Sequence, residues 1–445
     1  MFSMKRREFL RIAGLATAGV GISRSAWAAR QAYPRFPGGD APWKATWDAA
    51  LQVLAGNVKP VPKYDQPMLM EGAVYPGAWM ECGPQEALVY AGLRHYVPQH
   101  DGQPDPLKVA RANHMAFFAL QREDGQIPSA IKVSGEVGYG QIQMVVPIAA
   151  TAWEVVQLTH DEELLTAAYA ACSKWDAWLR RYRDTRKTGL VEGFCTYDTG
   201  HDNSPRWKGI PNRCPDSDAR KCPPIATMPR LCPDLSATTY GGRVALAAMA
   251  KALDKRDDAA RWEQDAETIR RLILEKLYDP EDAAFYDLDA QNNFVKVRGD
   301  VITRVLGEHV LKLEIAGDRK IFEDIWSRQL HNPKAFWTPF PFPSIAIDDP
   351  TFVRPIPRNS WGGASQALTA LRTPRWMAHY GKEAEQRELM HAWVTAIARS
   401  GEPGGAGEFR QQMDPLTGEF TRADPSGYSP AALVYLEFVH RLGAH

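Results

Sequence analysis

The stretch YDTGHDNSPRW, residues Tyr197–Trp207, decides how the rest of the chain is interpreted. It places Asp202 in a tight turn rich in Gly, Asn and Pro, with aromatic residues on both sides. Aromatic rings present apolar area to the CH faces of a sugar, and poorly solvated surroundings raise the pKa of a carboxyl group, so that it keeps a proton near neutral pH. Such a group can protonate a leaving oxygen. Asp202 is therefore the first candidate for a general acid.

A purely structural interpretation of this stretch stays open. Asp202 and Asn203 would form only an Asx turn ahead of a proline, and Trp207 would be part of the core. Under the functional interpretation, the neighbours that we expect to shape a sugar site are Tyr197, Asn203, Arg206 and Trp207.

The same stretch resembles a Gly-x-Asp-Asn-Ser-Pro-Arg-Trp-like motif of glycoside hydrolases that fold as an (α/α)6 toroid. The pattern is similar to family 63, to its mannosylglycerate- and glucosylglycerate-hydrolase-like relatives and, more distantly, to the trehalases. This resemblance implies an all-α toroid of six helical hairpins with long loops at one end, and it puts the acid at Asp202. It runs in segment order through most of the chain and is most specific around Asp202 and the DPLTG turn, Asp414–Gly418.

The first residues predict export. KRREFLR, Lys5–Arg11, is a twin-arginine signal, followed by a short apolar segment, Ile12–Ile22, and a small-x-small cleavage site, Ala26–Ala28. The apolar segment is too short to span a bilayer, so we expect residues 1–28 to be removed. The expected partner during export is the twin-arginine translocon, and the mature protein would be periplasmic or secreted without a stable membrane anchor. An uncleaved N-terminus held on the membrane is the alternative.

The mature chain, residues 29–445, is expected to form one catalytic domain, because no segment of it reads as a linker. Its 53 basic and 53 acidic residues cancel without long runs of either sign, which disfavours a nucleic-acid or anionic-membrane surface. Many of the 14 tryptophans are in loop-like stretches such as Ala335–Pro343, as in carbohydrate clefts. The expected partner is a carbohydrate, and this chemistry requires no metal and no cofactor.

Hydrophobic periodicity along the chain is helical, with little sustained alternation. The segments expected to be amphipathic helices are Trp43–Leu54, Pro84–Tyr96, Pro106–Leu120, Val145–Leu158, Asp161–Tyr182, Thr239–Leu253, Ala259–Leu277, Glu308–Ile315, Lys320–Gln329, Ser365–His379, Glu383–Ala398 and Ser429–Leu442. Twelve such segments suit a ring of six hairpins. A superhelical solenoid is the alternative, but the chain shows no fixed-period repeat.

Six cysteines follow the signal, and three of them, Cys214, Cys222 and Cys232, are in one Pro-rich segment without helical or strand periodicity. In an oxidising compartment we expect one or two disulfides there, including a possible bridge to Cys195, and spacing does not give the pairing. A zinc site is the competing interpretation. It is disfavoured because neither C-x-x-C nor a histidine pair accompanies these thiols.

Three further loops contain candidate sugar-binding residues. Trp79 and Glu81 precede a helix start where relatives carry an aromatic residue followed by an Asp that contacts the sugar in the deepest subsite; a carboxylate stabilised by the helix dipole is the alternative for Glu81. GYGQIQMVVP resembles a Gln-containing helix start, with Gln141 or Gln143 in the Gln position, and a neutral amide suits hydroxyl recognition. Trp361, in NSWGG, stands where relatives carry Trp-Arg-Gly-x-x-Trp.

The loop GEFRQQMDPLTGEF, residues 407–420, departs from the family pattern. In relatives a Glu before the DPLTG-like turn is the general base, and that position is Gln411 here. A carboxamide does not take a proton from water at neutral pH. Three explanations follow: Glu408 in the same loop acts as the base, another carboxylate such as Glu402 reaches the water, or the protein binds sugar without hydrolysing it efficiently.

We interpret the protein as an exported glycoside hydrolase that cleaves an α-linked sugar by inversion, with Asp202 as acid, Glu408 as base and Gln411 among the sugar contacts. Carboxyl groups about 6.5–9.5 Å apart leave room for the water of an inverting reaction, whereas a separation near 5 Å indicates retention. Two alternatives stay open. One is a catalytically impaired carbohydrate-binding toroid; the other is a polysaccharide lyase using His201 and Tyr197, although the cleft segments are not rich in Arg or Lys.

Overall fold

The computed structural model describes residues 42–97 and 104–443. The expected twin-arginine signal, residues 1–28, lies outside the described residues, so export stays a prediction. Within the two described ranges, no helix has the length and apolar character needed to cross a membrane.

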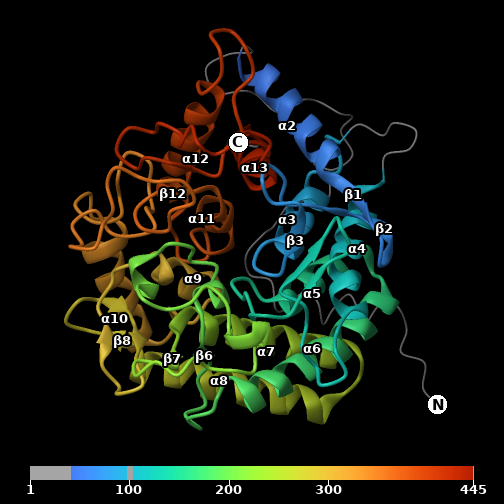
Figure 1. Ribbon diagram of the computed structural model, residues 1–445, viewed down its shortest axis with the longest axis vertical. Coiled ribbons are helices and arrows are strands. Elements are labelled where there is room, and N and C mark those ends of the chain that lie inside the picture. Colours follow the sequence, from blue (N-terminus) through green and yellow to red (C-terminus); the bar gives the residue numbers. More distant parts are fainter. Residues whose placement is uncertain (1–41, 98–103, 444–445) are drawn as a thin grey trace.

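Two concentric layers of helices form a closed ring (Figure 1). The inner helices are α3 (Gly83–Gly92), α5 (Ile148–Thr159), α7 (Pro233–Ala252), α9 (Val301–Gly307), α11 (Ala367–Arg372) and α13 (Ser429–Gly443). The outer helices are α2 (Trp43–Asn57), α4 (Pro106–Ala119), α6 (Glu162–Tyr182), α8 (Arg256–Lys276), α10 (Ala316–Ile325) and α12 (Glu383–Ala398). The chain passes once around the ring, and this (α/α)6 toroid confirms the expected fold.

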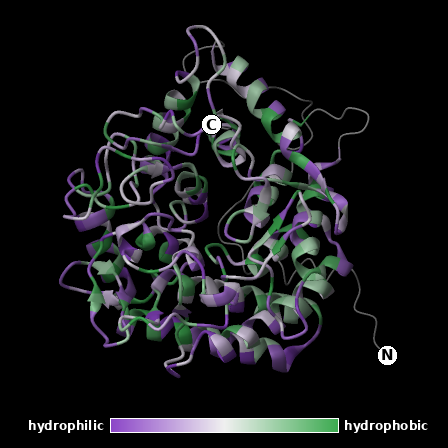
Figure 2. Cartoon of the chain, in the orientation of Figure 1, coloured by the Kyte–Doolittle hydropathy of each residue, from purple (hydrophilic) through white to green (hydrophobic). Residues whose placement is uncertain are grey.

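The long outer helices follow directly from local sequence. In α6, the Asp161 side chain caps the N-terminus by accepting from the backbone N–H of Leu164, and two glutamates are in the first turn. Two arginines in the last turn complement the opposite end of the helix dipole. Figure 2 shows hydrophilic and hydrophobic residues alternating along α6 and α8, as expected for helices with one face against the core.

Helix α13 closes the ring by packing against α2 and α3, the first two helices of the described residues. Trp47 of α2 is fully buried, and its ring meets the Tyr96 ring edge-on at 5.1 Å. The Tyr96 hydroxyl bonds His440 Nδ1 of α13 at 2.8 Å. The two ends of the described chain are therefore joined through buried aromatic contacts.

Short antiparallel strands lie within the segments that connect the helices. The strands are β1 (Val58–Val61), β2 (Tyr64–Leu69), β3 (Gly77–Trp79), β4 (Ala130–Lys132), β5 (Val137–Gly138), β6 (Glu192–Gly193), β7 (Arg230–Leu231), β8 (Tyr278–Asp279), β9 (Ala284–Phe285), β10 (Asp287–Leu288), β11 (Phe294–Val295), β12 (Ser365–Gln366) and β13 (Gln412–Met413). They form sheets in the orders β1-β2, β3-β4-β5, β11-β10-β7-β6, β8-β9 and β12-β13. Most are two or three residues long, too short to show an alternating pattern.

Three of the helix predictions need correction. The expected helix at Glu308–Ile315 is wrong, because α9 ends at Gly307 and His309 has a left-handed φ of 55°. The expected helix at Ser365–His379 is divided into β12, α11 and a 3₁₀ turn, Thr373–Arg375, which has a proline in its first turn. Helix α7 begins at Pro233 instead of Thr239, since a proline at the first helical position leaves no N–H unsatisfied.

Candidate active site

A cleft with a volume of about 460 Å³ lies among the loops that lead into the inner helices. Its lining comes from residues 71–81 before α3, 122–143 before α5, 197–217 before α7, 359–361 before α11, Leu368 within α11, and residue 411 before α13. The sequence-predicted site residues that line it are Trp79, Glu81, Gln143, Tyr197, Asp202, Trp361 and Gln411. This volume suits a small glycoside.

A row of hydrogen bonds runs along one wall of the cleft to Asp202. Asn359 Nδ2 donates to Asp202 Oδ2 at 2.9 Å, and Gln411 Nε2 donates to Asn359 Oδ1 at 2.9 Å. The Tyr75 hydroxyl donates to Gln411 Oε1 at 2.8 Å. Gln411 therefore lies in the cleft, as expected, and is joined to Asp202 through a single side chain.

Apolar rings form a second part of the wall. Trp361 is buried, and Trp79, which remains partly exposed, packs against the same small cluster together with Leu368. The backbone N–H of Trp361 donates to the Asp202 carbonyl oxygen at 3.1 Å. These rings offer the apolar surface that the CH face of a pyranose requires.

The Asp202 carboxyl group has the protonation behaviour of a general acid. Burial, together with the nearby charge of Glu81, raises the pKa of Asp202 to about 7, although the hydrogen bond from Asn359 acts in the opposite direction. The group therefore holds a proton up to neutral pH. This is the state that donation to a leaving oxygen requires.

Glu81 lies against the backbone of the Asp202 turn. A Cβ on Gly200 would come within 1.6 Å of Glu81 Oε2, so the carboxylate occupies the space of the missing side chain. Burial raises the pKa of Glu81, while the guanidinium groups of Arg372 and Arg304 and a hydrogen bond from Gln143 lower it. The Glu81 carboxyl group therefore has two guanidinium cations and one hydrogen-bond donor, the Gln143 amide, as neighbours.

The amide of Gln143 is itself held by a neighbour, because Gln141 Nε2 donates to Gln143 Oε1 at 3.0 Å. Gln143 has a left-handed φ of 48°, which is a strained conformation for a residue with a side chain. In this backbone conformation, the side-chain amide of Gln143 donates a hydrogen bond to Glu81. Both glutamines that the sequence singled out are therefore in the site.

Glu71 also lines the cleft, and sequence reasoning missed it. It follows β2 without a motif that would have drawn attention to it. Carboxyl oxygens of Glu71 and Glu81 and the Cys82 thiol lie within 4.8 Å of one another. Burial and the neighbouring Glu86 and Glu81 hold the pKa of Glu71 well above its usual range, although the Tyr428 hydroxyl donates to its Oε1 at 2.6 Å. The surroundings of Glu71 therefore favour its protonated form.

Arg206 does not line the cleft, so its expected sugar contact is corrected. It is buried, and its guanidinium donates to Asp234 at 2.7 and 2.8 Å and to Asp287 at 2.6 and 2.8 Å. Asp234, near the start of α7, is thus a partner of Arg206. The Arg206 guanidinium therefore supports the Asp202 turn through its buried contacts with Asp234 and Asp287.

Trp207 and Asn203 are likewise not among the lining residues. Trp207 is buried and donates through Nε1 to Thr199 Oγ1 at 2.8 Å. Asn203 is exposed, has a left-handed φ of 57°, and donates from Nδ2 to the Asn359 carbonyl oxygen at 2.8 Å. Both residues fix the shape of the turn, which agrees with the structural interpretation of that part of the motif.

Glu408 does not line the cleft, so its expected role as base is corrected. Its side chain is 40% exposed and forms an ion pair with Arg410 at 2.7 Å. Its backbone N–H is bound to Ser400 Oγ. The Gly-rich loop that was expected to bring Glu408 to the sugar instead places it next to the largely buried Arg410.

His201 does not support a lyase. It is buried, its Nε2 lies 2.8 Å from Asp300 Oδ1, and it is not among the residues that line the cleft. Burial and the charge of Arg304 lower its pKa to about 4, against the opposing effect of Asp300. Tyr197 lines the cleft, but without a histidine beside it the Tyr/His pair of an elimination reaction is not assembled.

The cysteines are free thiols, so the expected disulfides are not formed in this structure. Cys195 and Cys214 nevertheless touch, with their sulfur atoms 3.6 Å apart, and the partly buried Cys222 packs against them. Arg183 forms a buried ion pair with Asp198 beside these thiols, at 2.5 Å. That guanidinium makes the cluster of Cys195, Cys214 and Asp198 a poor site for a cation.

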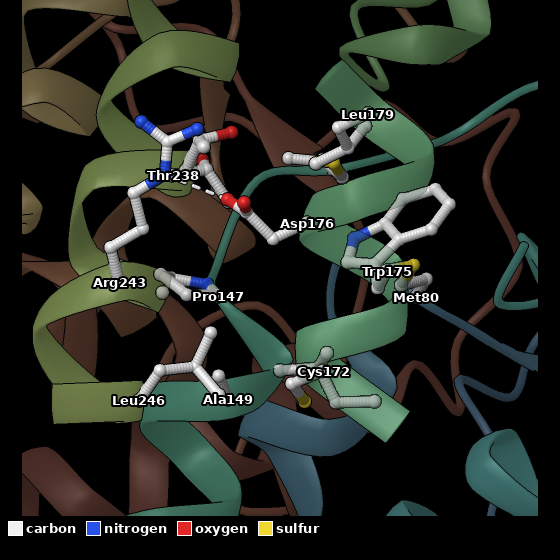
Figure 3. A pocket seen from close by; sticks show the side chains of 14 residues that line it. Met80, Pro147, Ala149, Cys172, Trp175, Asp176, Leu179, Thr238, Arg243 and Leu246 are labelled. Atoms are coloured by element: carbon white, nitrogen blue, oxygen red, sulfur yellow. Dashed lines mark hydrogen bonds and ion pairs between the residues drawn. The ribbon is translucent and has the colours of Figure 1, made fainter. Parts of the chain in front are cut away.

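A second cavity, of about 30 Å³, lies between α5, α6 and α7 (Figure 3). Its labelled residues include Trp175, Pro147 and the ion pair between Arg243 Nε and Asp176 Oδ1 at 2.7 Å. The volume suffices for about one water molecule and is too small for a sugar. The larger cleft is therefore the candidate active site.

A family profile, described as the mannosylglycerate hydrolase MGH1-like glycoside hydrolase domain, matches residues 106–429, well over half of the chain. The protein belongs to this glycoside hydrolase family. No curated protein matches the chain significantly. The match confirms the resemblance found in the sequence and includes the loops that contribute Gln143, Asp202, Trp361 and Gln411.

Solved structures share the toroid of this MGH1-like domain. The family 63 mannosylglycerate hydrolase from Thermus thermophilus has a TM-score of 0.66 at 18% identity, over 88% of this chain and 99% of that one. Neutral trehalase from Saccharomyces cerevisiae has a TM-score of 0.59 at 14% identity, over 85% and 75%. A family 78 rhamnosidase from a Bacillus species has a TM-score of 0.59 at 13% identity, over 91% of this chain and 35% of that one. At these identities the likeness is one of fold.

The contact between Gly200 and Glu81 in the MGH1-like domain can be tested with a matched pair of glycines. Gly200 and Gly209 have left-handed φ values of 62° and 80°, but nothing lies within 4 Å of a Cβ added at Gly209. Both alanine variants should lose about 1–2 kcal/mol of unfolding free energy through backbone strain. Gly200→Ala should lose about 1–3 kcal/mol more, because the methyl group displaces Glu81. Denaturant unfolding measures the difference, and equal losses would contradict this placement.

Proposed function

We propose that the protein is an exported glycoside hydrolase that cleaves an α-linked sugar by inversion, with Asp202 protonating the leaving oxygen. The observation that carries the proposal is the Asp202 carboxyl group, which faces a sugar-sized cleft and has a pKa raised to about 7. Trp79 and Trp361 supply the apolar wall of the sugar site, and Gln143 and Gln411 supply amides for hydroxyl groups. Export is supported by the sequence of residues 1–28 alone.

The charges around the cleft favour a substrate whose leaving group is anionic. The carboxyl groups of Glu71, Glu81 and Asp202 are together in one part of the cleft. Arg122, which lies 3.9 Å over the Tyr139 ring, and the exposed Arg213 also line the cleft. We infer that the sugar ring binds beside the carboxyl groups and that a carboxylate-bearing aglycone, such as the glycerate of mannosylglycerate, binds toward the arginines.

A panel of α-glucosides, α-mannosides and α-galactosides, each with a glycerate and a glycerol aglycone, tests both parts of this proposal. Hydrolysis with a preference for the glycerate member of a pair supports the charge argument, and preference for the neutral member would contradict it. The anomer released first, followed by NMR, separates inversion from retention.

Asp202→Asn should abolish hydrolysis but preserve binding. The amide has the size of the carboxyl group but does not donate an acidic proton, so kcat should fall by about 10²–10⁴-fold. Isothermal titration calorimetry should find the dissociation constant of the best panel substrate within a few-fold of the wild-type value. An unchanged kcat would contradict the assignment of Asp202 as the general acid.

The pH profile should report the same carboxyl group. Only protonated Asp202 donates to the leaving oxygen, so kcat/KM should decline as the pH rises through about 7, the raised pKa of Asp202. Above that value the decline should approach tenfold per pH unit. A plateau extending past pH 9 in steady-state assays is incompatible with Asp202 as the acid.

A carbohydrate-binding toroid without efficient catalysis is the second candidate function, and the amide at Gln411 favours it. Under this alternative, the wild-type protein binds a panel sugar but does not hydrolyse it, and Gln411→Glu gains hydrolysis. Under our proposal, the wild-type protein hydrolyses the sugar, and Gln411→Glu brings no gain.

A further inference from the structure

We propose that Glu81 is the carboxylate that activates the attacking water, in place of the residue that Gln411 replaces. This inference rests on the proposed hydrolytic function. It moves the second catalytic group from the loop before α13 to the loop before α3.

The cleft itself leaves few choices for this group. Its lining contains four carboxyl groups, those of Glu71, Glu81, Glu136 and Asp202. Asp202 is the acid, and Glu136 is 60% exposed and paired with Lys132 at 2.8 Å. Glu71 is more deeply enclosed than Glu81 and is fixed by the Tyr428 hydroxyl. Glu81 is therefore the remaining carboxylate that faces the same space as Asp202.

Two cations and a hydrogen-bond donor surround Glu81 and favour its ionised form, against the burial that raises its pKa. Gln143 donates to its carboxylate, and Arg372 lies beside it, with Nη2 3.3 Å from the Glu81 carbonyl oxygen. Arg372 Nε and Nη1 have no hydrogen-bond partner among the described residues, so this buried guanidinium is not neutralised by another bonded carboxylate. Arg304 adds a second cation. A carboxylate stabilised in this way can accept a proton from water.

The two carboxyl groups are driven toward opposite roles by their environments. Burial raises the pKa of both groups, but the charge of Glu81 raises that of Asp202 further, whereas two guanidinium groups and an amide oppose the rise at Glu81. Environments that separate the protonation states of two neighbouring acids distinguish an acid from a base in one site.

The reaction step balances with these groups alone. The oxygen of a water molecule forms a bond to the anomeric carbon as its proton passes to Glu81. The bond between that carbon and the glycosidic oxygen breaks, and the proton of Asp202 goes to the departing oxygen. The products are the free sugar and the alcohol of the aglycone, with Glu81 protonated and Asp202 ionised until the protons redistribute.

Azide rescue tests this role directly. Glu81→Ala should lower kcat by about 10²–10⁴-fold with a smaller change in KM. Sodium azide should restore turnover and yield a glycosyl azide, because azide attacks without losing a proton and fits the space vacated by the side chain. Glu81→Gln, which keeps the size of the side chain, should show the same loss with an unchanged melting temperature.

The matched control is Glu308→Ala, which removes another buried glutamate with a raised pKa, about 8, that does not line the cleft. Its kcat should equal that of the wild type. If Glu81→Ala retains wild-type kcat, or if the glycosyl azide arises from Glu71→Ala instead, Glu81 is not the base although the enzyme is a hydrolase. A wild-type protein that hydrolyses no glycoside overturns the proposed function itself.

An independent observation carries a second inference: we propose that Cys195 and Cys214 form a disulfide in an oxidising environment. Their buried sulfur atoms are already 3.6 Å apart. The two segments also pair through their backbones next to the thiols, with Thr196 N–H donating to the Pro211 carbonyl at 3.0 Å and Tyr197 N–H donating to the Asn212 carbonyl at 3.1 Å. The bond therefore needs only a small movement of two side chains.

Such a bond would join two parts of the segment before α7 that contributes to the cleft lining. Cys195 is two residues before Tyr197 and seven before Asp202, while Cys214 follows Arg213. In its formation one cysteine thiolate attacks an external disulfide and releases one external thiolate, and the second cysteine thiolate then attacks the first cysteine's sulfur in the mixed disulfide and releases the other external thiolate. The two cysteines lose two electrons and two protons, and the external disulfide is reduced to two thiols.

Thiol counting of the full chain tests the bond. After treatment with oxidised glutathione, the number of free thiols under denaturing conditions should fall from six to four. A peptide should link Cys195 to Cys214, and Tm should rise by about 3 °C or more. Cys214→Ser should prevent these changes, whereas Cys172→Ser, on α6, should permit them. Six remaining thiols, or a link through Cys222, would overturn the inference.

Discussion

The buried guanidinium of Arg206 is the constraint on which the site depends. It lies four residues after Asp202 in the chain and joins Asp234 of α7 to Asp287 of β10 through two bidentate contacts. Buried charges are tolerated when they are paired and hydrogen-bonded, and here both carboxylates are satisfied by one cation. The turn that presents Asp202 is therefore attached to an inner helix and to the largest sheet.

The same network extends around the ring. Arg206 Nη1 lies 3.0 Å from His201 Nδ1, His201 Nε2 bonds Asp300 at the start of α9, and Asp300 accepts from Thr369 of α11 at 2.8 Å. Three inner helices thus contribute to the support of a single loop. A loop held in this way presents Asp202 to the cleft without a large movement, since its shape is determined by the helices that form the fold.

The toroid could be predicted from the sequence because helical periodicity is visible along the chain. The cleft loops and Asp202 as a candidate could be predicted because local motifs mark them. Sequence reasoning did not distinguish residues that face the cleft from residues that support it. Arg206 and Trp207 follow Asp202 within one motif, yet both side chains point into buried contacts, and those of Arg206 depend on partners 28 and 81 residues further along the chain. Glu71 was missed for the same reason, since only the closed ring brings it beside Glu81.

The amide at position 411 has a physical consequence that a glutamate would not share. Gln411 donates to Asn359 Oδ1, which leaves Asn359 Nδ2 directed at Asp202. A carboxylate at 411 offers only acceptors, so it would face the Asn359 oxygen with repulsion or turn that amide away from Asp202. The amide therefore keeps the Asp202 carboxyl group oriented and leaves this wall without a carboxylate at position 411. Glu81, on the α3 side next to Gly200, places a carboxyl group in the cleft without disturbing that row of hydrogen bonds.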